Sequence, residues 1–323
     1  MGGSNMMDRH DLSVVDDTPV IASARNLTKR FGDFTAVDGV SFDIRENKIY
    51  GLLGRNGAGK TTVMQMLTAQ SRQSSGDIEI FGSRPYENAS ALAKVCFVKE
   101  SQKYPDDFKV RHVIDCAARL LPHWDRQFAD ELMSDFDLPA GRKVKKLSRG
   151  MLSTLGVVIG LASRAPLTFF DEPYLGLDAV ARHMFYDRLL ADYSQNPRTV
   201  ILSTHLIDEV SDLLEHVLLI DKGAIVIDAD AEDLRQSAFT LSGAADAVDR
   251  FLGDRRVLHR ESLGTFARVS IERQLSFEDR SRAASLRIEV EPLSLQQLII
   301  RNTTAPGSDS MKSSDPTDKE SAS

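Results

Sequence analysis

The segment GRNGAGKT at residues 54–61 constrains the fold of this chain more than any other feature, because it fits the pattern G-x-x-x-x-G-K-[ST]. It follows the apolar run 48–53, which is typical of a buried strand, and it opens a helical pattern over 60–69. Glycines allow a loop to wrap an anion with its N–H groups turned inward, and the next helix directs its positive N-terminal end to the same point. The segment therefore predicts a phosphate-binding loop. The alternative is a chance match in a glycine-containing turn.

Each position of this loop has a chemical reason. The three glycines let the backbone approach a phosphate closely. Lys60 is expected to reach the terminal phosphates of a nucleotide, and the Thr61 hydroxyl is expected to ligate Mg²⁺. The candidate nucleotide-binding positions in the loop are Gly54, Arg55, Asn56, Gly57, Ala58, Gly59, Lys60, Thr61 and Thr62.

Two further strand ends carry groups suited to phosphate chemistry. The apolar run 167–170 ends at Asp171, suited to hold Mg²⁺ through its water shell, and Glu172, suited to orient and deprotonate a water molecule. Another apolar run, 200–203, leads to His205, which is expected to contact a γ-phosphate because ligands of open α/β sheets bind at such strand ends. The plainer alternatives are a polar strand end that caps the next helix and a histidine without a ligand.

Between residues 20 and 235, short β-branched or aromatic runs alternate with longer amphipathic ones, which predicts an α/β domain with a largely parallel sheet. The predicted strands cover 34–44, 48–53, 77–81, 167–170, 199–203 and 217–220, and the predicted helices cover 60–69, 179–193 and 207–214. Strand signals disappear over 104–163, where a helical insertion is expected with helices at 110–121, 125–136 and 151–162.

The ends of the chain have a different texture. Residues 1–19 are expected to form an acidic N-terminal tail. Residues 236–302 predict a small accessory α+β domain, with strands at 256–259, 265–271 and 285–290 and a helix at 244–251. Residues 303–323 are rich in Ser, Thr, Asp and Lys and are expected to form a disordered tail, since so few apolar groups cannot offset the entropy of ordering.

Composition excludes several classes of protein. With 42% hydrophobic and 27% charged residues, the chain buries a core and is not disordered as a whole. Its two cysteines, Cys96 and Cys116, form neither a disulfide framework nor a zinc spacing, which favours a reducing compartment. Residues 1–20 lack the apolar stretch of a secretory signal, and the longest uncharged run, 150–163, is too short to span a bilayer. The net charge of −7 and the lack of a basic face disfavour a nucleic-acid partner.

Five segments in one order resemble the nucleotide-binding subunit of an ABC transporter over residues 20–235: GRNGAGKTT, a glutamine-containing loop, LSRGM, FFDEP with GLD, and STH. The resemblance implies an α/β fold with a P-loop NTPase (RecA-like) core, an antiparallel β subdomain and the helical insertion, followed here by the small C-terminal α+β appendage. In that family the helical insertion carries a signature, usually LSGGQ, that closes over ATP held by the partner subunit. LSRGM at 147–151 occupies its place.

The match to the signature is partial. Ser148 and Gly150 agree with the family pattern, whereas Arg149 and Met151 do not. The retained pair is suited to bind the γ-phosphate through a hydroxyl and a backbone N–H at a helix N-terminus. Ser148 also fits a simple N-cap of the helix that follows, which would explain the serine alone.

Other roles follow from the resemblance residue by residue. It implies that Lys60 and Thr61 bind phosphates and Mg²⁺ and that Asp171 assists the metal. It makes Glu172 the catalytic base and His205 the switch histidine.

The remaining correspondences are looser. Asp178 matches the D-loop, which passes between subunits, and Phe31 stands where an aromatic ring stacks on adenine, with a core position as the alternative. Gln102 is implied as a Mg²⁺ ligand and a sensor of the membrane partner, although it comes later than in the usual pattern. Tyr174, where Thr is usual, and Arg55, where Pro is usual, are expected to touch neighbours of the site rather than its chemistry.

The resemblance implies an ATP-hydrolysing subunit that dimerises on ATP and drives a separate integral-membrane permease, with ATP and Mg²⁺ bound. LSRGM, the separate ATPase chain and the extra C-terminal module resemble exporters in particular. The second ATPase subunit is a copy of this chain or a paralogue. The implied location is cytoplasmic, peripheral on the inner face of the cell membrane through the permease.

Two other functions compete with this one. A soluble ABC-type regulatory ATPase is disfavoured by the single nucleotide domain, the lack of a long coiled-coil insertion and the lack of a basic surface. A small-molecule P-loop kinase would leave LSRGM and His205 without a role.

Overall fold

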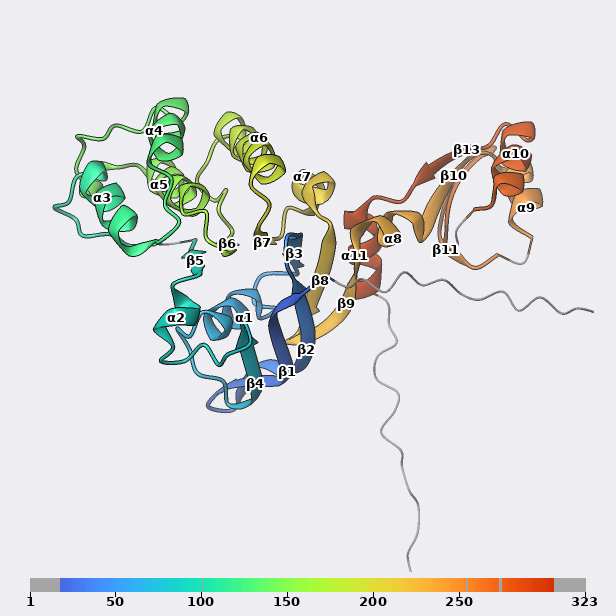
Figure 1. Ribbon diagram of the computed structural model, residues 1–323. Coiled ribbons are helices and arrows are strands. Elements are labelled where there is room, and N and C mark those ends of the chain that lie inside the picture. The colour runs from blue at the N-terminus through green and yellow to red at the C-terminus, as the bar shows by residue number, and fades with distance from the viewer. Residues whose placement is uncertain (1–17, 101, 254, 273–274, 305–323) are drawn as a thin grey trace, which may run out of the picture. The chain divides into compact units, whose positions relative to one another are not determined.

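The computed structural model describes residues 18–100, 102–253, 255–272 and 275–304 (Figure 1). The chain divides into two compact units, the first ending at Ala231 and the second beginning at Glu232. The expected acidic tail at 1–19 lies outside the described residues except for its last two positions. The expected disordered tail at 303–323 lies outside them from residue 305 onward.

The first unit is built on a six-stranded sheet with the order β5-β6-β7-β3-β8-β9. Its strands are β3 (Ile49–Leu53), β5 (Val95–Val98), β6 (Leu167–Asp171), β7 (Thr199–Thr204), β8 (His216–Asp221) and β9 (Ala224–Asp230). All neighbouring pairs from β5 to β8 are parallel, and β9 runs antiparallel to β8. Strands β3, β6 and β7 are buried along their whole length, as their unbroken apolar runs predict for parallel strands covered on both faces.

The register of this sheet assembles the candidate site. Leu53, the last residue of β3, pairs with Thr204, and Asp171 pairs with Ser203. Because the strands are parallel, their carboxyl ends meet at one edge. The loop after β3 and the polar residues after β6 and β7 therefore lie side by side, although they are more than 100 residues apart in the sequence.

A smaller antiparallel sheet has the order β2-β1-β4. Its strands are β1 (Val20–Phe31), β2 (Phe34–Arg45) and β4 (Ser75–Ile80). One hydrophobic core joins this sheet to α1 (Lys60–Leu67) and the six-stranded sheet, with Leu27, Met64 and Phe169 among its buried members. Helix α1, which follows the phosphate loop, therefore packs between the two sheets. The short helix α2 (Ala89–Leu92) precedes β5.

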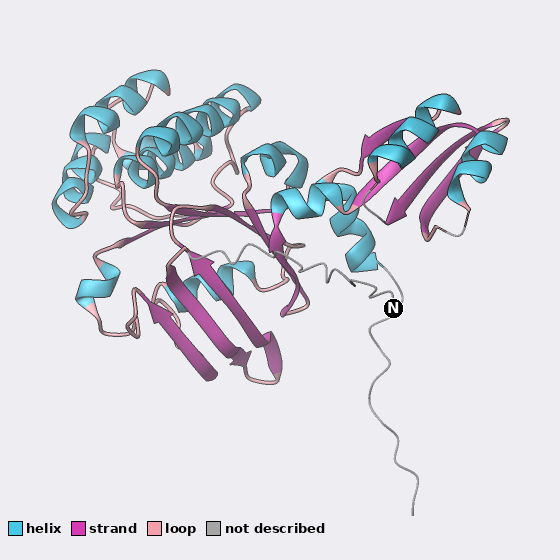
Figure 2. Cartoon of the chain, turned by 45° about the vertical axis from the view of Figure 1, so that its right-hand side comes forward, coloured by secondary structure: helices cyan, strands magenta, loops and turns pink. Residues whose placement is uncertain are grey.

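Helices cover the other side of the six-stranded sheet (Figures 1 and 2). The helical insertion and the segments that follow it form α3 (Val110–Leu120), α4 (Arg126–Asp135), η1 (Val144–Lys146), α5 (Arg149–Ala162), α6 (Ala179–Gln195), α7 (Ile207–Val210) and η2 (Ser211–Leu213). Helix α5 packs against the sheet so closely that a Cβ on Gly160 would lie 2.3 Å from a ring carbon of Phe170. No helix in the described part of the chain is long and apolar enough to cross a membrane.

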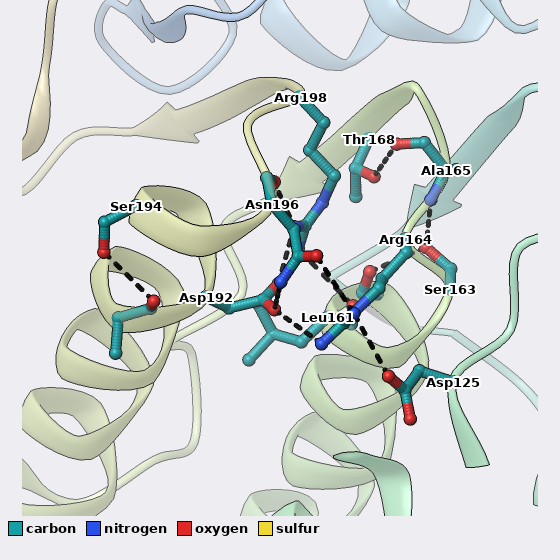
Figure 3. A network of polar contacts seen from close by, with 12 residues as sticks. Asp125, Leu161, Ser163, Arg164, Ala165, Thr168, Asp192, Ser194, Asn196 and Arg198 are labelled. Carbon is teal, nitrogen blue, oxygen red and sulfur yellow. Dashed lines mark hydrogen bonds and ion pairs between the residues drawn. The ribbon is translucent and has the colours of Figure 1, made fainter. Parts of the chain in front are cut away.

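A partly buried polar network holds the helical insertion against α6 (Figure 3). Asp192 on α6 lies 2.5 Å from the Arg198 guanidinium and 3.0 Å from that of Arg164, which follows α5. Arg164 also lies 3.1 Å from Asp125, the residue that caps α4. Since Asp192 and Arg198 are almost fully buried, each charge depends on the other for its pairing.

The second unit has a β-α-β-β-α-β order in a four-stranded antiparallel sheet, β11-β12-β10-β13. Its elements are α8 (Ala231–Gln236, which begins one residue before the unit), β10 (Ala238–Ala244), α9 (Ala245–Leu252), β11 (Val257–Leu263), β12 (Phe266–Glu272), α10 (Phe277–Ser285), β13 (Glu289–Pro292) and α11 (Leu295–Thr304). Its hydrophobic core includes the buried residues Phe239, Leu241, Val248, Phe251 and Val269. This is the split β-α-β arrangement of ferredoxin-like domains.

Most predicted elements have their observed counterparts within a few residues. Two differ in kind. The helix expected over 207–214 ends at Val210 and continues as the 3-10 turn η2. The strand expected over 285–290 starts only at Glu289, because α10, begun by a capping box between Ser276 and Asp279, runs on to Ser285.

Candidate nucleotide-binding site

Residues 54–59 form a loop between β3 and α1, as expected. Gly59 precedes α1 with φ at 114°, and a Cβ there would lie 2.7 Å from the Ala36 carbonyl oxygen, so only glycine fits. No side chain caps the start of α1 and no acidic residue lies in its first turn. The N–H groups of this helix end are therefore available to an anion.

The remaining loop positions divide by exposure. Arg55, Asn56 and Gly57 are exposed, and Thr62 on α1 is half-buried. Lys60 is only 6% exposed, and its Nζ donates to the Gly54 carbonyl oxygen at 2.7 Å. An ammonium held inside a loop of N–H groups adds positive charge at the point where phosphates would lie.

Thr61 and Asp171 are brought together across the edge of the sheet. The Thr61 hydroxyl donates to Asp171 Oδ2 at 2.8 Å, and Asp171 Oδ1 is buried with no hydrogen-bond partner among the described residues. Burial raises the pKa of the Asp171 carboxyl, while the hydrogen bond from Thr61 opposes that rise. A buried carboxylate oxygen without a partner, beside a threonine hydroxyl, is a donor set that fits Mg²⁺.

Glu172 lies at the centre of the site in a strained conformation. Its φ is 50°, in the left-handed region that costs a non-glycine residue of the order of 1 kcal/mol, and its N–H donates to the Ser203 carbonyl oxygen at 3.1 Å. Its Oε1 lies 3.4 Å from Lys60 Nζ, and its Oε2 lies 2.9 Å from His205 Nδ1. The loop lysine and the candidate switch histidine thus both contact the carboxylate of the candidate base.

Tyr174 belongs to this cluster, contrary to the expectation that it only touches neighbours of the site. Its hydroxyl donates to Glu172 Oε2, lies 2.6 Å from Thr204 Oγ1 and accepts a hydrogen bond from the His205 N–H at 3.2 Å. The sequence does hold a signal for this. A buried phenol needs a polar partner, and Tyr174 follows Glu172 by two residues in an apolar setting.

The signature and D-loop residues lie at helix ends. Ser148 caps α5 by accepting a hydrogen bond from the Met151 N–H at 3.2 Å, so the N-cap interpretation is correct. Asp178 caps α6 in the same way, through Ala181. A Cβ on Gly150 would lie 2.6 Å from the Gly176 carbonyl oxygen, so the two segments touch. In the part of the chain that is described, their polar contacts do not reach Lys60 or Glu172.

Phe31 is an exposed residue and not part of the core. It ends β1, is 52% exposed, and has Lys29 Nζ 4.9 Å from its ring centroid. The core alternative is therefore wrong, and the ring is accessible to a ligand.

Gln102 bonds within its own loop. Its backbone N–H donates to the Lys99 carbonyl oxygen at 3.3 Å, and it lines a cavity of about 310 Å³ together with Glu100 and Arg149. Glu100, which sequence reasoning overlooked, lies 3.4 Å from Arg149 of the signature segment. The loop after β5 is thus linked to α5 through Glu100.

Comparison with known proteins identifies the family. The family model described as ABC transporter matches residues 37–175. The Nod factor export ATP-binding protein I of Burkholderia lata is 30% identical over 251 residues, which cover 76% of this chain and 80% of that protein. The chain belongs to the ATP-binding proteins of ABC transporters.

Two further matches agree with this membership. The ABC transporter ATP-binding protein YtrB of Bacillus subtilis is 24% identical over 269 residues, covering 83% of this chain and 90% of that protein. A solved structure of the ATP binding subunit of an ABC transporter superposes with a TM-score of 0.61 at 20% identity, over 67% of this chain and 92% of the other. The expected fold class is confirmed.

The membership also confirms the expected biochemical class. This ABC cassette binds ATP, is an ATPase, and acts as the ATP-binding subunit of a transporter rather than as a regulatory ATPase. The family does not assign roles to single residues of this chain.

Proposed function

We propose that this cassette hydrolyses ATP between two ATPase subunits and thereby drives a separate integral-membrane permease that exports its cargo. The observation that carries the proposal is that Lys60 and His205 both contact the Glu172 carboxylate at the edge of the sheet. Export is supported by the similarity to the Nod factor export protein. The proposed location is the inner face of the cell membrane, where the permease would hold the cassette.

Each residue of the site has a proposed task. Lys60 leaves the Gly54 carbonyl oxygen, 2.7 Å away, to bind the β- and γ-phosphates at the N-terminus of α1. Glu172 accepts a proton from the attacking water, and His205 binds the γ-phosphate. Phe31 stacks on adenine with its exposed ring. The loop residues Gly54, Arg55, Asn56, Gly57, Ala58, Gly59 and Thr62 surround the phosphates.

Thr61, Asp171 and Gln102 are the proposed Mg²⁺ ligands. When bound, the metal neutralises charge that develops on the phosphate oxygens. Asp171 Oδ1 suits this task because it is buried without a hydrogen-bond partner among the residues described. Gln102 would have to move, since its own N–H and side-chain contacts now stay within its loop.

The second subunit would supply Ser148 and Gly150 to the nucleotide held here, and Asp178 would lie between the subunits. Ser148 is exposed at the start of α5, and Asp178 is exposed at the start of α6. Both positions are therefore accessible to a second subunit, although each side chain also caps its helix. A second copy of this chain or a paralogue would fill that place.

Glu172→Gln tests the proposal. Without the carboxylate, hydrolysis is expected to fall by about 10²–10⁴-fold while ATP still binds. The variant should then accumulate as an ATP-bound dimer, measured by light scattering after gel filtration in ATP and Mg²⁺. Glu131→Gln, an exposed change on α4, is the matched control and should keep the wild-type rate and monomer–dimer balance.

Two results would contradict the proposal. Hydrolysis by Glu172→Gln at the wild-type rate would remove Glu172 from its role. A variant that stays monomeric with saturating ATP, with a candidate permease present, would remove the dimer. In contrast, co-purification of a multi-span membrane protein with the tagged wild-type chain would support the permease.

A further inference from the structure

The two oxygens of the Glu172 carboxylate have different surroundings. Oε2 accepts a hydrogen bond from the Tyr174 hydroxyl and lies 2.9 Å from His205 Nδ1. Oε1 is buried and has no hydrogen-bond partner in the described ranges, and it forms an ion pair with Lys60 Nζ at 3.4 Å. One oxygen is therefore held, and the other faces the lysine that lines the phosphate loop.

The hydrogen bonds around Tyr174 are consistent with a phenol that donates to Glu172. Burial raises the pKa of the Tyr174 phenol, and the hydrogen bond to Glu172 raises it further, so the hydroxyl keeps its proton. The His205 backbone N–H donates to the Tyr174 oxygen, which leaves the phenol proton for Glu172. The Leu206 N–H donates to Thr204 Oγ1 at 2.8 Å, so the threonine proton is free to go to Tyr174 at 2.6 Å.

The phenol ring of Tyr174 is also held in place. Tyr174 is 1% exposed, and the Arg182 guanidinium of α6 lies 5.6 Å from its ring centroid. Arg182 in turn lies 2.5 Å from Glu209 of α7. The ring therefore has few other positions, and neither does the carboxylate oxygen that it holds.

From this geometry we infer that Tyr174 is a positioning residue for hydrolysis: its hydroxyl holds Glu172 Oε2 and thereby presents Oε1 as the oxygen that accepts the proton of the attacking water. The inference rests on the proposed role of Glu172 as the base. In the family pattern that this chain resembles, threonine is usual at this position. The threonine hydroxyl lies on Cβ, whereas the tyrosine hydroxyl lies at the far end of an aromatic ring.

The chemical step that this arrangement serves is balanced. The water oxygen forms a bond to the γ-phosphorus, and the bond from that phosphorus to the bridging oxygen breaks, with its electron pair leaving on ADP. The water proton passes to Glu172 Oε1. Tyr174 loses no proton in the step, because it donates to Oε2 throughout. Its contribution is a fixed direction of the accepting lone pair.

Tyr174→Phe removes the hydroxyl and keeps the buried ring. We expect the kcat for ATP hydrolysis to fall by about tenfold or more, the effect of losing one hydrogen bond to a charged group, while KM for ATP stays within about twofold. The rate is referred to the fraction of protein that binds ATP, so that misfolded material is not counted. Tyr186→Phe on α6 is the matched control, since the Tyr186 hydroxyl is buried without a hydrogen-bond partner among the described residues.

A double variant separates positioning from a structural role. In the Glu172→Gln background the base is absent, so Tyr174→Phe should change the residual single-turnover rate by less than about twofold. If Tyr174→Phe lowers the rate equally in both backgrounds, the hydroxyl does not act through Glu172 and the inference is overturned.

The remaining outcomes distinguish this inference from the function on which it rests. Wild-type kcat in Tyr174→Phe, together with loss of hydrolysis in Glu172→Gln, overturns the inference alone. Wild-type hydrolysis in Glu172→Gln overturns the proposed base itself. A fall in ATP binding by Tyr174→Phe, with kcat per bound ATP unchanged, assigns the hydroxyl to structure.

Discussion

Two clusters of buried charge in the first unit are built in opposite ways. Around Asp192, both carboxylate oxygens are used: Oδ2 lies 2.5 Å from Arg198, and Oδ1 lies 3.0 Å from Arg164 (Figure 3). At the edge of the sheet, Asp171 Oδ1 and Glu172 Oε1 are buried with no hydrogen-bond partner in the described ranges.

From this difference we infer that the Asp192 cluster serves the fold and that the cluster around Asp171 and Glu172 is suited to a ligand. Burying a carboxylate costs several kcal/mol unless its lone pairs are paired, so an unpaired oxygen persists only where the surrounding structure holds it there. We call the Asp192 cluster complete because both of its carboxylate oxygens are paired without any other molecule, although the Nε atoms of Arg164 and Arg198 have no hydrogen-bond partner among the described residues. We call the cluster around Asp171 and Glu172 incomplete because two of its oxygens have no hydrogen bond among the described residues, and Glu172 Oε1 has only its ion pair with Lys60 at 3.4 Å. The left-handed backbone of Glu172, with φ at 50°, adds to the cost.

Breaking the complete cluster should have the largest effect on stability. Asp192→Ala leaves the Arg198 guanidinium buried without its carboxylate, so we expect the free energy of unfolding to fall by about 3–5 kcal/mol. Urea unfolding followed by circular dichroism measures this. Asp115→Ala, which breaks an exposed pair with Arg126, is the matched control and should change little. Equal losses in the two variants would mean that burial of the pair does not matter.

Removing the negative charge of Asp171 from the incomplete cluster should raise the free energy of unfolding rather than lower it. Asp171→Asn removes a buried charge, so at pH 7 we expect the free energy of unfolding to rise by the order of 1 kcal/mol, while hydrolysis that depends on Mg²⁺ is lost. Because burial raises the pKa of Asp171, the wild type is destabilised as the pH rises from the ordinary value of 3.8 through the higher folded-state pKa.

The advantage of the asparagine should therefore shrink toward pH 4, where the wild-type carboxyl is also neutral. Thermal melts at pH 4 and pH 7 compare the two. A variant that is less stable than the wild type at pH 7 would show that the Thr61 hydrogen bond outweighs the burial of the charge.

The incomplete cluster was largely predictable, because its parts are local. The phosphate loop is one contiguous segment, and Asp171, Glu172 and His205 each end an apolar run, so the rule that parallel strands end at one edge brings them together. The role of Tyr174 was missed although Glu172 precedes it by only two residues. Its other partners, Thr204 and His205, lie some 30 residues away, across a strand pairing whose register no local pattern specifies.

The fold was predictable to a similar degree, and its misses have physical causes. Strand β1 (Val20–Phe31) escaped notice because its pairing with β2 is broken by several register shifts, which disturb the alternation of apolar and polar residues. The complete cluster was also missed. Asp192 and Arg198 belong to one helix end and one loop, and only the tertiary structure shows that both are buried.

Glu100 offers the test with the smallest expected effect, since it pairs with the signature segment but is exposed. Its pair with Arg149 is 3.4 Å long, with side chains 44% and 72% exposed. Solvent screens such a pair, so Glu100→Gln should lower the free energy of unfolding by less than about 0.5 kcal/mol and leave hydrolysis within about twofold. High salt should erase even that difference, which urea unfolding at two ionic strengths measures.

Arg149→Gln should have the same effect as Glu100→Gln, because either change breaks the same pair. A loss of hydrolysis in both variants at unchanged stability would place this pair with the incomplete cluster, as a link between the loop after β5 and the signature segment, and burial would then no longer separate the two kinds of charge in this domain.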